Sequence, residues 1–508
     1  MRVAAPGHGA AGKDTRDPTF RICREMRIGS LTSRRHGTVE QHDLIVVGGG
    51  AAGLVTASGS AGLGARVALV ERERMGGECL WTGCVPSKAL LACAKAAAQA
   101  RLASRLGVHA EPRVDFAGVM RWVHGARETI YPHDSPERFR GLGVDVIEGT
   151  ARFTGERTLD VDGRILQAKR IVIATGSRPA VPPIPGLAST SFLTNETIFE
   201  ITEQPRHLLV LGGGASGVEL AQAFARLGSR VTVLERGTTF LPREEPELAA
   251  MLRVCLETDG VVLQLGAEVT AARRDGERIV LTVSAGGAVR DVEGTHLLVA
   301  TGRESRTDTM DLARGGVATG PGGVQVDRHL RTTAAGVWAC GDCVGGPRFT
   351  HVADYQARLV IRNAFFPFKG TADYSAIPWI TYTDPELAHV GLTEAEARER
   401  HGDGVRVFTR PFQDVDRAIA DGHTAGAVRL VTSAKGKLLG GHILGAGAGD
   451  MIGEVALAVA RGLSVNAIGG VVHAYPSMPE AVRQAAEQYN RARFTGAAKR
   501  VARWFARR

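Results

Sequence analysis

Two stretches of the chain share one pattern of apolar runs separated by a glycine cluster and a helix of small residues. In the first, the uninterrupted apolar run 44–47 precedes a glycine cluster, an expected helix over 51–63 and a second strand over 66–71. Short runs without polar alternation are typical of parallel strands buried on both faces. The same order returns from the run 207–211 to the run 230–235, so the pattern predicts two β-α-β units whose first glycines lie 164 residues apart (212 minus 48). This spacing indicates a duplicated domain type and not a solenoid repeat, whose period is shorter.

The first glycine cluster has the spacing of a phosphate-binding turn. Gly48 allows the tight turn after the strand, Gly50 allows the backbone to approach a pyrophosphate, and Gly53 allows close packing of helix on strand. Free N–H groups at the start of the helix then stabilise the anion. Glu71 ends the next strand, 18 residues after Gly53, where an acidic residue binds an adenosine ribose. These four residues predict a dinucleotide site.

The second glycine cluster is equally complete. It consists of Gly212, Gly214 and Gly217, and Glu235 again follows the last glycine by 18 residues. A carboxylate at this position bonds a ribose 2′-OH and repels a 2′-phosphate, so it favours NAD(H) over NADP(H). Two arginines follow close behind Glu235 and weaken this preference, which leaves NADP(H) as an alternative.

Length and composition indicate a multidomain enzyme. A chain of 508 residues is too long for one hydrophobic core, and its 64 glycines are typical of many tight strand-to-helix turns. After about residue 370 the pattern changes to alternating strand-like runs with helices over 450–463 and 479–493, which predicts a separate α+β domain. No apolar run approaches a membrane span and no secretory signal is evident, so a cytoplasmic location is expected.

The net charge of +9 is concentrated at the two ends of the chain. Residues 1–40 carry eight basic and four acidic residues, and residues 491–508 carry seven basic residues and no acidic one. The ends therefore contribute +11 and the body about −2, which argues against a nucleic-acid-binding protein. Residues 1–41 are expected to be a disordered basic extension, or upstream sequence translated from an early start codon. The basic tail 491–508 is expected to be a solvated helix end, with weak contact to anionic lipid or an acidic partner as the alternative.

Seven cysteines, an odd number without regular spacing, argue against a disulfide-stapled secreted domain. Cys340 and Cys343 form a C-x-x-C, but a second ligand pair is missing and no metal site is predicted. Cys79 and Cys84, with four residues between them, lie just before an expected helix that begins near Pro86. A thiolate at Cys84 would face that helix N-terminus, which lowers a thiol pKa. A redox-active pair is favoured over two cysteines buried at the edge of a core helix.

The sequence resembles the class I pyridine nucleotide–disulphide oxidoreductases from about residue 43 to about residue 490. The resemblance rests on residues 76–88 around these cysteines, on the two glycine clusters and on the order of these motifs along the chain. The resemblance implies an α/β fold with two Rossmann-like domains, for FAD and NAD(P), and a C-terminal α+β dimerisation domain. The implied boundaries are 42–178 and 303–371 for FAD binding, 179–302 for NAD(P) binding and 372–490 for dimerisation.

The resemblance also implies roles for single residues. Thr175, Gly176 and Gly302 lie in the crossover strands that flank the NAD(P) domain, and Asp342 is expected to bind the FAD ribityl chain. Thr350, His351 and Gln356 match the segment that follows. Lys88 and Glu219 match an ion pair near the flavin. Cys84 is expected to be the flavin-side thiol and Cys79 the interchange thiol, which together pass electrons from NAD(P)H through FAD to a small acceptor.

The C-terminal segment departs from the family pattern. Disulfide-reducing members use a His-Pro-Thr-x-x-Glu segment from the partner subunit of a homodimer, whose histidine exchanges protons with the interchange thiol. Alignment on Pro476 and Glu480 places Tyr475 where that histidine belongs. A phenol with a pKa of about 10 is a poor base near neutrality, and His473 is a weaker alternative candidate. Tyr475 and Glu480 are therefore the predicted catalytic residues of this segment.

Several alternatives for the acceptor stay open. Mercuric reductases carry tyrosine near this position, but they end in a cysteine pair, whereas this sequence has no cysteine after Cys343. A disulfide, a quinone or a metal ion is each compatible with the motifs. The competing hypotheses are an NAD(P)H:quinone reductase or transhydrogenase whose cysteines are not essential, and a non-enzymatic sensor.

Overall fold

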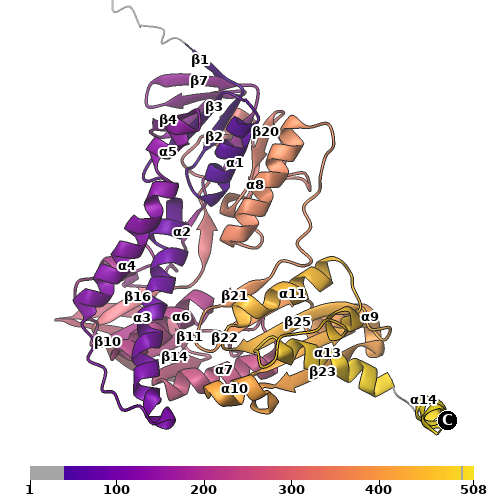
Figure 1. Ribbon diagram of the computed structural model, residues 1–508. Helices are drawn as coiled ribbons and strands as arrows, with labels where there is room; N and C mark the ends of the chain where they lie inside the picture. The colour runs from indigo at the N-terminus through magenta and orange to yellow at the C-terminus, as the bar shows by residue number, and fades with distance from the viewer. Residues whose placement is uncertain (1–38, 494–495, 508) are drawn as a thin grey trace, which may run out of the picture. The chain divides into compact units, whose positions relative to one another are not determined.

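The computed structural model describes residues 39–493 and 496–507 (Figure 1). The first glycine cluster belongs to a parallel five-stranded sheet whose strand order is β20-β8-β2-β3-β4. Its strands are β2 (Leu44–Val47), β3 (Val67–Glu71), β4 (Val144–Glu148), β8 (Ile171–Ile173) and β20 (Val337–Ala339). All four residues of β2 are buried, as expected for a strand covered on both faces. Helices α1 (Ala51–Gly62) and α8 (Thr350–Phe365) pack against each other beside this sheet (Figure 1).

A second, four-stranded sheet has the order β1-β7-β6-β5. Its strands are β1 (Glu40–His42), β5 (Ala151–Gly155), β6 (Thr158–Val161) and β7 (Arg164–Ala168). Residues 1–38 of the extension expected over 1–41 lie outside the described residues. The last two residues of the expected extension, 40 and 41, belong to strand β1.

Four helices follow β3. They are α2 (Gly77–Trp81), α3 (Cys84–Leu102), α4 (Phe116–Ile130) and α5 (Pro136–Gly141). The helix expected to begin near Pro86 begins two residues earlier, at Cys84. Proline is tolerated in the first turn because the first N–H groups of a helix have no intrahelical acceptor.

The second glycine cluster belongs to a parallel sheet of order β12-β11-β10-β16. Its strands are β10 (His207–Leu211), β11 (Arg230–Glu235), β12 (Val261–Leu265) and β16 (His296–Val299), accompanied by α6 (Ala215–Leu227) and α7 (Pro246–Thr258). An antiparallel sheet is inserted before β16, formed by β13 (Glu268–Asp275), β14 (Arg278–Ala285) and β15 (Ala288–Gly294). The chain enters and leaves this region through β9 (Ser177–Pro179) and β17 (Arg303–Ser305), which pair with each other. The short β18 (Thr319–Gly320) and β19 (Gly323–Val324) also pair.

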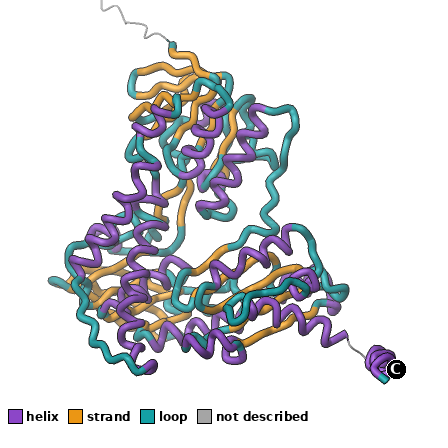
Figure 2. The backbone as a smooth tube through the Cα atoms, viewed as in Figure 1, coloured by secondary structure: helices purple, strands orange, loops and turns teal. Residues whose placement is uncertain are grey.

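The C-terminal region is an antiparallel sheet of order β21-β22-β25-β24-β23 with helices packed on it (Figure 2). Its strands are β21 (Trp379–Thr381), β22 (Glu386–Gly391), β23 (Arg406–Pro411), β24 (Ala427–Thr432) and β25 (Leu438–Gly445). Its helices are α9 (Glu394–His401), α10 (Asp416–Asp421), α11 (Ala448–Ala460), α12 (Val465–Gly469) and α13 (Glu480–Arg493), and α14 (Gly496–Ala506) follows. In the part of the chain that the structure describes, no helix is long and apolar enough to cross a membrane.

Candidate active site

The first glycine cluster forms a turn that only glycine can make. Gly48 has a φ of +109°, and a Cβ there would lie 2.3 Å from the carbonyl oxygen of Ala174. A Cβ on Gly53 would lie 1.7 Å from the carbonyl oxygen of Gly48. Gly50 is the N-cap of α1, so the free N–H groups of the first helical turn lie where a pyrophosphate would bind. This cradle fits the ADP half of FAD.

Backbone contacts join the cradle to the cysteine segment. A Cβ on Gly77 would lie 2.6 Å from Gly50 Cα, so two backbones approach here without side chains between them. The N–H of Gly76 donates to the carbonyl oxygen of Gly49 over 2.9 Å. The segment that carries Cys79 is therefore packed directly on the phosphate cradle.

The second cradle repeats this geometry. Gly212 also has a φ of +109°, and a Cβ on Gly217 would lie 2.1 Å from the carbonyl oxygen of Gly212. A Cβ on Gly214 would meet no atom within 4 Å, so its protein surroundings leave space for a ligand. The second cradle therefore fits a nicotinamide dinucleotide.

The two predicted ribose-binding carboxylates occupy equivalent positions. Glu71 accepts hydrogen bonds from the backbone N–H groups of Gly49, over 2.5 Å, and of Glu73, over 2.8 Å. Glu235 accepts from Gly213, over 2.7 Å, and from Gly237, over 2.6 Å. Each carboxylate is thus held at the mouth of its own cradle, where an adenosine ribose would lie.

Cys79 and Cys84 lie on consecutive helices, Cys79 in α2 and Cys84 as the first residue of α3. The Cys84 sulfur lies 3.3 Å from the hydroxyl oxygen of Thr350, the first residue of α8. The hydrogen bond from the Cys79 thiol lowers the pKa of Cys84 to about 6, and the bond to Thr350 and the charge of Lys88 act in the same direction. The same bond, together with burial, raises the pKa of Cys79. The pair therefore consists of one thiolate and one neutral thiol at neutral pH.

Lys88 lies one helical turn after Cys84, on the same face of α3. Its Nζ is 2.8 Å from Oε2 of Glu219, which is only 5% exposed. Glu219 Oε1 accepts the backbone N–H of Tyr382 over 2.8 Å, and Lys88 Nζ lies 4.4 Å from the centre of the Tyr382 ring. Helices α3 and α6 and the loop after β21 thus meet beside Cys84. The sequence patterns do not predict Tyr382 as a member of this cluster.

A second ionic cluster includes Glu78, the residue before Cys79. Glu78 forms an ion pair with Arg303 and accepts a hydrogen bond from Asn195 over 3.0 Å. Burial raises the pKa of Glu78 to about 7. Arg303 also lies 3.7 Å from Asp342, whose carboxylate accepts the hydroxyl of Ser177 over 2.5 Å. Asp342, predicted as a flavin ligand, is thus linked through Arg303 to Glu78, and neither Glu78 nor Arg303 is predicted as a site residue from the motifs.

The remaining predicted cofactor residues lie in turns at the strand ends. Gly176 and Gly302 both have positive φ, of +70° and +121°, and the Thr175 hydroxyl donates to the backbone oxygen of Arg306 over 2.7 Å. Cys340 and Cys343 are fully buried. No cluster of His, Cys, Asp and Glu suited to a metal ion occurs in residues 39–493 or 496–507.

Tyr475 and Glu480 do not lie beside the cysteine pair of their own chain. Tyr475 is 70% exposed, and its hydroxyl donates to Asp416 over 2.8 Å, which raises the phenol pKa. Glu480 is buried and bonds to Arg483 over 2.9 Å. These contacts stay within the C-terminal region, and the predicted catalytic role of both residues requires a second subunit.

His473 has a defined partner of its own. Its Nε2 lies 3.0 Å from Glu454 Oε2, and its Nδ1 lies 3.1 Å from the carbonyl oxygen of Val471. A carboxylate that holds an imidazole in this way fixes the orientation of the ring.

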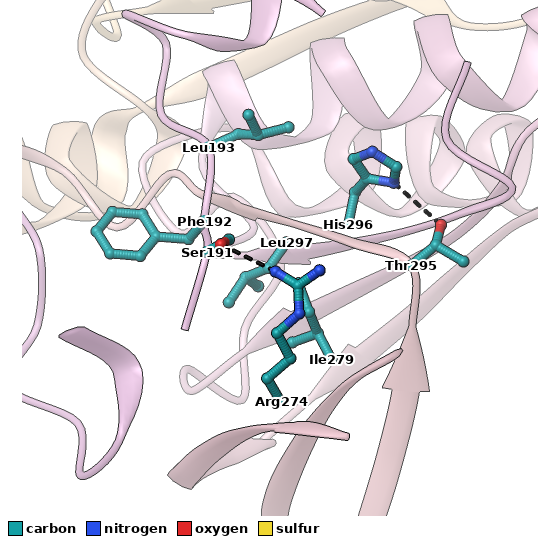
Figure 3. A pocket seen from close by; sticks show the side chains of 8 residues that line it. All are labelled: Ser191, Phe192, Leu193, Arg274, Ile279, Thr295, His296 and Leu297. Carbon is teal, nitrogen blue, oxygen red and sulfur yellow. Dashed lines mark hydrogen bonds between the residues drawn. The ribbon is translucent and has the colours of Figure 1, made fainter. Parts of the chain in front are cut away.

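A pocket near the start of β16 lies apart from these clusters (Figure 3). It has a volume of about 160 Å³, too small for a dinucleotide, and Arg274 and His296 line it with Ser191 and Thr295. None of the predicted site residues lines it.

The low pKa of Cys84 predicts an unusual pH profile for alkylation of the reduced enzyme. The thiolate persists down to about pH 6 and is lost below it, so the rate of iodoacetamide labelling at Cys84 should be nearly constant above pH 7. Mass spectrometry of the Cys84 peptide measures this rate, and Lys88→Met should move the midpoint to higher pH. A labelling rate that rises about tenfold per pH unit through neutrality, as for an ordinary thiol with a pKa of about 8.5, would contradict the assignment.

The fold and the site define a flavin-dependent oxidoreductase with two dinucleotide cradles and a redox dithiol. The model of the pyridine nucleotide-disulphide oxidoreductase family matches residues 42–357, and the model of the dimerisation domain of that family matches residues 377–486. The chain belongs to this family. It is an FAD-dependent enzyme that uses NAD(P)H, and the dimerisation domain supports a homodimer.

Relatives and solved structures agree with this assignment. A mercuric reductase of Streptomyces lividans is 40% identical over 461 residues, covering 88% of this chain and 96% of the relative. A dihydrolipoyl dehydrogenase of Thermus scotoductus is 35% identical, covering 88% and 97%. The Cu(II) complex of the HOCl-induced flavoprotein disulfide reductase RclA from Escherichia coli superimposes with a TM-score of 0.81 at 29% identity, covering 89% of this chain and all of that one. The predicted fold class and the disulfide-dependent activity are confirmed, and the quinone reductase or transhydrogenase alternative is not supported.

Proposed function

We propose that the acceptor is a thiophilic metal ion presented as a thiolate complex, which the enzyme reduces at the expense of NAD(P)H. The observation that carries this proposal is the position of Cys84 at the start of α3, with its sulfur 3.3 Å from the Thr350 hydroxyl oxygen, which favours a thiolate there beside a neutral Cys79 thiol. Thiolates are soft ligands that select soft metal ions. The balance for a divalent ion bound by two thiolates is NAD(P)H + M(SR)₂ → NAD(P)⁺ + M⁰ + RSH + RS⁻, so the proton formed from the hydride is taken up by one of the released thiolates.

The C-terminal segment supports a metal ion over a disulfide. Disulfide reduction, NAD(P)H + H⁺ + RSSR → NAD(P)⁺ + 2 RSH, requires the interchange thiol to lose its proton before it attacks and the leaving sulfur to gain one, and so gains from an acid–base group near that thiol. Tyr475 stands where relatives of the disulfide-reducing kind place a histidine, and its phenol pKa is raised. We assign the partner subunit's Tyr475 and Glu480 to the acceptor side of the dithiol.

We assign FAD to the first cradle and NAD(P)H to the second. Gly48, Gly50, Gly53 and Glu71 would hold the FAD dinucleotide, with Thr175, Gly176, Asp342 and Lys88 towards its ribityl chain and ring. When bound, the flavin would take up a hydride equivalent from the nicotinamide and supply two electrons to the cysteine pair. Lys88, fixed by Glu219, keeps a positive charge near Cys84 and so stabilises its thiolate.

The nicotinamide dinucleotide would be held by Gly212, Gly214, Gly217, Glu235 and Gly302. Glu235 favours NADH because its fixed carboxylate repels a 2′-phosphate. We assign residues 42–178 and 303–371 to FAD binding, 179–302 to NAD(P) binding and 372–490 to dimerisation. A cytoplasmic location and a role in cell redox homeostasis suit an enzyme that depends on NAD(P)H and whose described cysteines are free thiols.

A second candidate function is reduction of a small disulfide. The His473–Glu454 pair favours it, because an oriented imidazole two residues before Tyr475 could exchange the proton that a disulfide substrate requires.

An acceptor comparison with the purified holoenzyme tests the proposal. NADH oxidation should be faster with Hg(II) in excess thiol than with lipoamide or glutathione disulfide by about 10²-fold, since general acid–base catalysis contributes at least this factor. Tyr475→His should raise disulfide turnover, whereas Tyr475→Phe keeps the ring without a titrating group. Disulfide turnover equal to metal turnover, and lost in His473→Gln, would establish the second candidate.

A further inference from the structure

The basic tail forms an amphipathic helix. Within α14 and just after it, Lys499, Arg500, Arg503 and Arg507 fall within an arc of about 100° on a helix of 3.6 residues per turn. Trp504 and Phe505 fall outside that arc. A segregation of this kind gives the helix one cationic face and one aromatic face.

The aromatic face is open to solvent. Trp504 is 51% exposed and Phe505 is 64% exposed, and their ring centres lie 4.8 Å apart in an edge-to-face arrangement. Exposure of two large aromatic side chains side by side costs solvation free energy unless another apolar phase covers them.

The cationic face has no ion-pair partner in the described part of the chain. None of its four cations forms an ion pair within the residues that the structure describes, and residues 491–508 contain no acidic side chain. Arg500, Arg503 and Arg507 line a shallow hollow of about 280 Å³ together with Trp504. Guanidinium groups gathered around an indole match a phosphate headgroup above an apolar layer.

We propose that α14 seats the enzyme on an anionic lipid surface, with the arginines on the headgroups and Trp504 and Phe505 at the boundary of the acyl chains. Basic residues beside an anionic bilayer contribute additively, and a face rich in tryptophan and phenylalanine is typical of helices that lie in the interface. Nucleic acid explains the cations but does not explain two exposed aromatic side chains beside them. A second copy of α14 would bring like charges together. A homodimer presents two such helices, which strengthens attachment to one surface.

Vesicle co-sedimentation of the full-length holoenzyme tests this proposal. Binding to phosphatidylcholine vesicles containing phosphatidylglycerol should exceed binding to pure phosphatidylcholine and should fall with salt. The variant Arg500→Glu/Arg503→Glu/Arg507→Glu should lower the partition coefficient at least about 100-fold, given the contribution of each basic residue. Trp504→Ser/Phe505→Ser should also weaken binding, with NADH-dependent turnover unchanged in both variants.

The matched control reverses three exposed cations on the body, Arg314→Glu/Arg400→Glu/Lys435→Glu, and should bind vesicles as the parent does. Equal binding to neutral and anionic vesicles, absence of binding, or equal loss in the control would overturn the proposal. Tail-dependent binding to duplex DNA that anionic vesicles do not displace would also overturn it, in favour of a nucleic-acid surface.

Discussion

Replacement of Cys84 by serine should abolish acceptor reduction while the protein keeps its FAD. Serine cannot form the thiolate that Thr350 and Lys88 stabilise, so turnover should fall by about 10³-fold or more, on the scale of the loss of a catalytic nucleophile. The two-electron-reduced enzyme should also lack the long-wavelength absorption band that a thiolate against the flavin produces. Steady-state assays and an anaerobic titration with NADH measure both effects.

Two other variants make this result specific. Cys79→Ser removes the interchange thiol but leaves Cys84, so turnover should be lost while the absorption band remains. Cys93→Ser, a partly buried cysteine further along α3, should behave as the parent enzyme does. Full turnover in Cys84→Ser would show that the dithiol is not on the path of the electrons.

Gly53→Ala should have the largest effect on the folded state. A Cβ at this position would lie 1.7 Å from the carbonyl oxygen of Gly48, so α1 must move away from β2 and the first cradle must open. Overpacking of this kind costs about 3 kcal/mol, and the bound FAD should be lost with it. The flavin-to-protein absorbance ratio and the thermal unfolding midpoint report the two effects.

Gly62→Ala is the matched control, because Gly62 ends the same helix and a Cβ there meets no atom within 4 Å. This substitution should be neutral or should stabilise the helix by up to about 1 kcal/mol. A Gly53→Ala enzyme with full FAD and an unchanged midpoint would mean that the cradle does not need close packing at this point.

The sequence allows the two cradles to be predicted because their chemistry is local. The glycines and the acidic residue of each cradle follow one another within a single β-α-β unit, so the spacing of Gly48, Gly53 and Glu71 already implies their geometry. The start of α3 is predicted two residues late because Pro86 is taken as the first helical residue, whereas it lies in the third position of the first turn.

The parts that the sequence does not reveal depend on contacts between distant segments. Glu78 meets Arg303 across 225 residues, and Tyr382 reaches Lys88 from the loop after β21. Neither pair has a spacing that could be recognised in one sequence, because each depends on how separate sheets pack. The departure at Tyr475 is visible in the sequence, but its contact with Asp416 is not.

The backbone contact between Gly50 and Gly77 couples folding of the first cradle to positioning of the segment that carries Cys79. A nascent chain whose first turn has not closed has no platform for α2, so its sulfurs are not yet poised to receive electrons. Maturation of the enzyme thereby acquires a fixed order, in which the cradle closes before the thiols are aligned.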